Sequence, residues 1–168
     1  MNLIQQPIST IQLSIKLDLL KGSVNAMLIP AKGFTANGKK RLIFAGGYRK
    51  QKEKVTKYLH ENYKTLEDCM INKPEFYFTT VSYVVYDHWL TKCSEYMKLR
   101  KKDVSNFTKG SEDVIFKFLG LEDETIIYST VEKGLLKPLE TPQLHCNIEV
   151  YEMDTSIFKR LTGQNKEK

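Results

Sequence analysis

A chain of 168 residues with 41% hydrophobic residues and a net charge of +6 has the composition of a soluble globular domain. Its apolar stretches are far shorter than the roughly 20 residues of a membrane-spanning helix, and its N-terminus lacks the pattern of a secretory signal. The three separate cysteines form no C-x-x-C pair, which argues against a disulfide framework and favours a cytoplasmic location, or a particle assembled in the cytoplasm.

The charge is distributed unevenly along the chain. Residues 1–110 carry 19 Lys/Arg and 9 Asp/Glu, residues 111–154 carry 3 and 10, and residues 155–168 carry 4 and 1. Such asymmetry favours either a polyanionic partner or the association of unlike surfaces.

The N-terminal part of the chain predicts an extended arm followed by a three-stranded meander. Pro7 disfavours a helix in residues 1–10, and apolar residues then alternate with polar ones over 11–19, the period of a half-buried strand. A second strand is expected over 24–30, with an extension to Thr35 left open. Asn37-Gly38 favours a type I′ hairpin turn into a third strand over 40–45.

The middle of the chain predicts two helices around one strand. The first helix is expected over 49–68. Residues 75–86 are apolar on both faces, which predicts a central strand covered on both sides. A second helix is expected over 87–102, because Trp89, Leu90, Cys93, Tyr96 and Met97 follow helical spacing.

The C-terminal part predicts three strands and a short helix. The strands are expected over 114–119, 125–131 and 144–150, and the helix over 154–163. The order β-β-β-α-β-α-β-β-β-α predicts an α+β fold with a mostly antiparallel sheet or a partly closed barrel, with an opening similar to that of an OB-fold.

The same elements predict one domain. Residues 1–10 form the arm, residues 11–163 a single α+β domain and residues 164–168 a disordered tail. No internal repeat or linker divides the chain.

The sequence contains no recognisable catalytic or metal-binding pattern. The three histidines show no zinc spacing, and His145 and Cys146 would point to opposite faces of a strand. There is no nucleophile elbow, and Cys93 is better explained as a buried thiol. Gly46-Gly47 lacks the spacing of a phosphate-binding loop and is better explained as a tight turn. We therefore expect no catalytic residues, no metal and no cofactor.

Basic residues form two clusters that interleave with tyrosines. Tyrosine rings beside lysines and arginines can hold single-stranded nucleic acid, although such a run is also typical of a solvated helix surface. The candidate nucleic-acid-binding residues in 39–58 and 98–102 are Lys39, Lys40, Arg41, Arg49, Lys50, Lys52, Lys54, Tyr58, Arg100 and Lys101.

Two functions follow from these observations. The first is a non-enzymatic assembly, adaptor or structural subunit of a larger complex, for example an accessory or connector component of a phage or mobile element, with protein partners or self-association. The alternative is a nucleic-acid-binding protein that uses the two basic clusters. An enzyme of an unrecognised type is the third and weakest hypothesis, and no membrane partner is expected.

Overall fold

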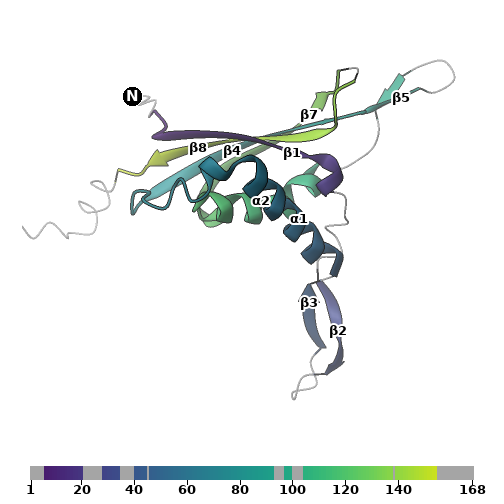
Figure 1. The fold of residues 1–168 in the computed structure, drawn as a ribbon, viewed down its shortest axis with the longest axis horizontal. Helices are drawn as coiled ribbons and strands as arrows, with labels where there is room; N and C mark the ends of the chain where they lie inside the picture. Colours follow the sequence, from purple (N-terminus) through teal and green to yellow (C-terminus); the bar gives the residue numbers. More distant parts are fainter. Residues whose placement is uncertain are drawn as a thin grey trace, which may run out of the picture.

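The computed structural model describes residues 6–20, 28–34, 40–44, 46–92, 97–99, 104–137 and 139–154 (Figure 1). It is an α+β fold, as the sequence predicts. The helices and strands are β1 Ser9–Lys16, β2 Leu28–Phe34, β3 Lys40–Phe44, α1 Gly46–Asn62, β4 Tyr77–Asp87, β5 Leu90–Lys92, β6 Met97–Leu99, α2 Ser105–Leu119, β7 Ile126–Leu135 and β8 Gln143–Glu152.

A four-stranded sheet in the order β1-β8-β4-β7 carries the fold. β8 pairs antiparallel with both β1 and β4, whereas β4 and β7 are parallel, so β1 also runs parallel to β4. The connections from β1 to β4 and from β4 to β7 therefore advance across the sheet in the same direction. Because such crossovers share a right-handed sense, α1 and α2 lie on the same face (Figure 1). The opposite face, called the outer face below, has no helix of the described residues against it.

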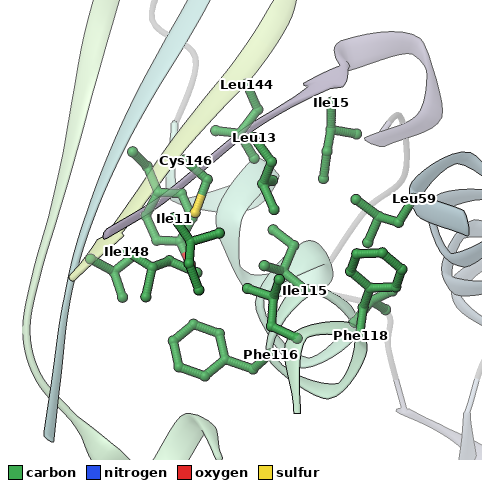
Figure 2. Close-up of a cluster of buried hydrophobic side chains, with 14 of the residues drawn as sticks. Ile11, Leu13, Ile15, Leu59, Ile115, Phe116, Phe118, Leu144, Cys146 and Ile148 are labelled. Atoms are coloured by element: carbon green, nitrogen blue, oxygen red, sulfur yellow. The ribbon is translucent and has the colours of Figure 1, made fainter. Parts of the chain in front are cut away.

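The hydrophobic core fills the space between the sheet and the two helices. Strand alternation places the odd-numbered residues of β1 and the even-numbered residues of β8 in this core, where they meet α1 and α2 (Figure 2). The residues labelled in Figure 2 are Ile11, Leu13, Ile15, Leu59, Ile115, Phe116, Phe118, Leu144, Cys146 and Ile148. Side chains from all four elements thus hold the two layers together.

Several predicted elements are confirmed with shifted ends. The strand expected over 11–19 is β1, which begins at Ser9 and gives way to a 3-10 turn over Leu17–Leu20. The helix expected over 49–68 is α1, which ends at Asn62. The strands expected over 40–45, 75–86, 125–131 and 144–150 are β3, β4, β7 and β8. The second strand, β2, covers Leu28–Phe34, which includes the part of the open extension that is described, whereas residues 24–27 and Thr35 lie outside the described residues.

The strand expected over 114–119 is wrong, because these residues are the last turns of α2. Five of the six are buried apolar residues, and a continuous apolar run does not distinguish a buried strand from a buried helix. The helix also includes Phe107 and Ser111, which are buried at helical spacing from Ile115. Gly120 ends it in the left-handed conformation, with φ of 77° and its N–H directed at the carbonyls of Phe116 and Lys117.

The helix expected over 87–102 is also wrong. The described residues there form the hairpin β5–β6, which pairs Leu90 with Leu99. In a helix Trp89 and Leu90 would share the buried face, but Trp89 is 1% exposed and Leu90 is 43% exposed. Side chains that alternate in this way belong to an extended chain.

Three further expectations about the sheet need correction. β1 does not open a meander, because it pairs with β8, and β2 pairs with β3 in a separate two-stranded sheet. β4 is central, as predicted, but the helices of the described residues cover only one of its faces. The four-stranded sheet is open, so the barrel alternative and the OB-like opening do not apply.

Some predictions fall outside the described residues. They are the Asn37-Gly38 turn, the helix over 154–163 beyond Asp154, the tail over 164–168 and the first five residues of the arm.

Candidate protein interface

One edge of the sheet, β1, is capped by a tyrosine side chain. The Tyr63 hydroxyl accepts a hydrogen bond from Ser14 N at 2.9 Å and donates one to Ser14 O at 3.2 Å. Tyr63 follows directly after α1, and its ring packs against Tyr58 with 6.4 Å between ring centroids. A further strand could not pair along β1 without displacing this hydroxyl, since edge strands bind through these backbone groups.

The opposite edge, β7, is open in the described part of the chain. No described strand pairs with its outer side. Ile127 is 65% exposed, and Tyr128 and Leu135 are each 63% exposed. We call Ile127, Tyr128, Val131 and Leu135 the β7 edge.

The β7 edge lacks most of the devices that keep edge strands from pairing. Such strands are usually short, bulged along their length or coated with charge. β7 has ten residues, and its only charged ones are Glu132 and Lys133. The Lys133 ammonium lies 4.8 Å from the centroid of the Trp89 ring, so its charge is directed to the helix-covered side. An extended chain could therefore add to the sheet here.

The outer face has aromatic pairs at both ends and polar side chains between them. Phe78 and Tyr151 stack with 5.0 Å between ring centroids. At the other end, the rings of Tyr86 and His145 lie with 4.7 Å between their centroids. The hydroxyl of Tyr151 donates a hydrogen bond to Glu149 at 2.7 Å, which raises the pKa of that tyrosine.

A hollow of about 410 Å³ lies among the polar side chains of the outer face. Gln12, Asn147 and Ser82 line it from neighbouring strands, in one row across the sheet. The Oδ1 atom of Asn147 is buried and has no hydrogen-bond partner among the described residues. A donor from a partner molecule would satisfy this atom.

The predicted basic residues on α1 do not form one uniform surface. Arg49 lies 3.7 Å from Glu53, and Lys52 pairs with Asp113 of α2. Burial opposes the charge on Lys52, but hydrogen bonds to Asp113 and Tyr48 outweigh it and raise the pKa. Lys50 and Lys54 are exposed, and the structure gives them no ion pair with another described residue. Ion pairs within α1 and between α1 and α2 thus neutralise part of the positive charge that the sequence places on α1.

The tyrosines proposed to stack on bases belong largely to the core. Tyr48 is buried, and Tyr58 is half-buried against the core, where burial raises its pKa. Of the other predicted site residues, Lys40 and Arg41 lie in β3, whose side chains are not described. Lys39, Arg100 and Lys101 lie outside the described residues. Because most of the 98–102 cluster lies outside the described residues, a single surface formed by the two basic clusters stays a prediction.

A network of three titratable side chains lies beneath the sheet: the buried Tyr83 and Cys146 and the half-buried Glu112. The Tyr83 hydroxyl donates a hydrogen bond to Glu112 Oε2 at 2.9 Å, next to Cys146. Burial raises the pKa of all three groups and leaves Cys146 a neutral thiol, which is a poor nucleophile. His145 points to the other face of β8, as predicted.

A second hollow, of about 430 Å³, lies between α1 and α2. Two pairs of charged residues in its lining contact each other: Lys52 with Asp113, and His60 with Glu67 at 3.1 Å between Nδ1 and Oε2. Within the described residues, no three His, Cys, Asp or Glu side chains gather closely enough to hold a metal ion.

Comparisons with known proteins add little to this geometry. No protein-family model matches the chain. The chain is similar to dolabella-3,7-dien-18-ol synthase TPS06 of Arabidopsis thaliana, with 27% identity over 144 residues. The match covers 79% of this chain but only 23% of the synthase, so the chain spans about a quarter of that protein's length. This similarity assigns the chain neither to a family nor to a class of enzyme.

Among the described residues, every helix is too short or too polar to span a bilayer.

Proposed function

We propose that the chain is a non-enzymatic subunit of a protein assembly, and that it docks to its partner through the β7 edge. The observation that carries this proposal is the contrast between the two ends of the sheet. Tyr63 caps β1, whereas β7 carries three large apolar side chains that are each more than 60% exposed. Exposed apolar residues on an open edge strand favour strand addition by a partner.

The energetics of burial support the same proposal. Covering an exposed Ile or Leu side chain contributes about 1.5–3 kcal/mol, and a paired strand also satisfies the outward N–H and C=O groups of β7. The outer face also offers polar contacts around Asn147 of β8, two strands away from β7. Free thiols at Cys69 and Cys146 are in keeping with a reducing compartment, so the proposal places the assembly in the cytoplasm.

Removing the apolar side chains of β7 is expected to release the chain from its complexes. The test is the double substitution Ile127→Thr and Leu135→Thr, which keeps strand propensity at Ile127 and shortens both side chains. Sedimentation of native extracts would measure the share of the chain in particles larger than the monomer, and this share should fall severalfold. The matched control is Ile71→Thr and Leu139→Thr, two exposed apolar positions outside β7. If the fraction of the chain in large particles were the same for both double variants, the proposal would be contradicted.

The second candidate function, nucleic-acid binding, is supported by Lys50 and Lys54. Both are exposed on one side of α1, and neither has an ion pair within the described residues. Phosphate contacts by two lysines predict an affinity for single-stranded oligonucleotides that falls with salt.

Replacing Lys50 and Lys54 with Glu should lower that affinity at least tenfold at low salt and reduce the salt slope by about two. Fluorescence anisotropy over a salt series would measure both quantities. The control is Arg49→Glu with Glu53→Arg, which reverses an existing ion pair without changing the net charge. An unchanged affinity in the Lys50/Lys54 variant would exclude this surface as the binding site.

A further inference from the structure

We infer that the partner at the β7 edge is a second copy of this chain, with the two β7 strands paired antiparallel about a two-fold axis at Val131. This inference rests on the proposed function, because it names the partner of the same edge. The result would be one continuous eight-stranded sheet with the helices of both copies on one side.

Symmetry restricts how two β7 strands can pair. A two-fold axis that relates antiparallel neighbours stands perpendicular to the sheet and so preserves its two faces. Side chains on the outer face of one copy must therefore lie opposite outer-face side chains of the other. The pairing of β7 with β4 is regular from Tyr128 to Leu135, with an irregularity only at Ile127. This regular stretch provides a continuous template for a second strand.

A register centred on Val131 covers the exposed apolar residues. It places Ile127 of one copy opposite Leu135 of the other, and Val131 opposite its own equivalent. Tyr128 then lies opposite Gly134, where a Cβ would stand 2.6 Å from the Tyr86 ring. Because Gly134 has no side chain, the Tyr86 ring can lie against it on the outer face. The Tyr128 ring of the second copy can then pack beside Tyr86.

The neighbouring registers fit less well. Centring on Thr130 places Ile127 opposite Lys133, and Tyr128 opposite Glu132. Centring on Glu132 places the two Glu132 carboxylates directly opposite each other, which is destabilising.

Charges beyond the two ends of β7 are opposite in sign. Asp123 and Glu124 precede the strand, Lys137 follows it, and all three are exposed. In an antiparallel pair the start of β7 in one copy lies toward the end of β7 in the other, so these opposite charges favour a second copy as the partner.

A cysteine pair can test this register directly. Thr130 lies opposite Glu132 of the second copy only when the axis passes through Val131, and paired positions fall within the Cα separation that a disulfide allows. The experiment mixes a tagged Thr130→Cys chain with an untagged Glu132→Cys chain under mild oxidation. Both carry Cys69→Ser and Cys93→Ser, and circular dichroism checks that both fold. The inference expects the mixed disulfide, with little disulfide from either chain alone.

Other outcomes would overturn the inference. Crosslinking of the Thr130→Cys chain or the Glu132→Cys chain with itself would indicate the register centred on that residue. Absence of any crosslink, with a monomer throughout a concentration series in sedimentation equilibrium, would exclude the second copy as the partner. If the native chain were found only in complexes with other proteins, and these depended on Ile127 and Leu135, the proposed function would stand and this inference would fail.

Substitution at the end of the strand gives a quantitative check. Leu135→Glu should weaken dimerisation at least about tenfold, because it removes an apolar contact that occurs twice. Leu139→Glu, at a fully exposed position beyond β7, should leave the dimer unchanged. Equal effects of the two substitutions would contradict the inference.

Discussion

Replacing Trp89 with alanine is expected to lower the free energy of unfolding by about 3–5 kcal/mol. The side chain is 1% exposed, and its Nε1–H donates a hydrogen bond to the Val85 carbonyl at 3.0 Å. The ammonium of Lys133, from β7, lies over its ring. Truncation would leave a large cavity at the junction of β4 with the β5–β6 hairpin and remove a contact that orients β7. Urea unfolding followed by circular dichroism would measure the loss.

Two further substitutions separate the cavity from other effects at this junction. Trp89→Phe keeps most of the buried volume and loses only the hydrogen bond, so it should cost less than Trp89→Ala. Leu90→Ala removes a side chain that is 43% exposed and should cost about 1 kcal/mol or less. If Leu90→Ala and Trp89→Ala were equally destabilising, both residues would be buried, as in the helix that the sequence pattern predicts.

The same junction explains why the sequence predicts part of the fold and fails in another part. β1, β4 and β8 are predicted because each has one clearly defined buried face or a long run of β-branched and aromatic residues. The spacing from Trp89 to Met97 matches a helix by coincidence. Conversely, the apolar run from Val114 to Leu119 fits either a strand or a helix, and only its packing against α1 and the sheet decides.

The candidate site was predictable only in part, for reasons of charge and topology. A linear count of lysines does not show that Lys52 pairs with Asp113, 61 residues away. The β7 edge was missed because sequence does not give the order of strands, and so does not show which strand is at an edge. One signal was present: adjacent large residues such as Ile127 and Tyr128 cannot both face the core from one strand.

Alkaline pH is expected to destabilise the fold through the buried Tyr83 and Cys146. Burial raises the pKa of both groups far above their ordinary values of about 10 and 8.5, so neither ionises in the folded protein as the pH rises to about 11. In the unfolded chain both lose their protons, which stabilises the unfolded state. The free energy of unfolding is therefore unaffected by the two groups below their ordinary pKa values, and it falls as the pH rises above those values. Each group costs about 1.4 kcal/mol per pH unit, or about 5 kcal/mol together by pH 11.

Cys146→Ala should remove the larger share of this pH dependence. Denaturant unfolding at pH 8 and at pH 11 measures the difference in free energy, which should shrink by about 3 kcal/mol in the variant. Cys69→Ala is the matched control, because that thiol is exposed and its removal should change the difference far less. An unchanged difference in the Cys146→Ala variant would show that the thiol ionises equally in both states, and hence that β8 does not hold it in the core between the sheet and α2.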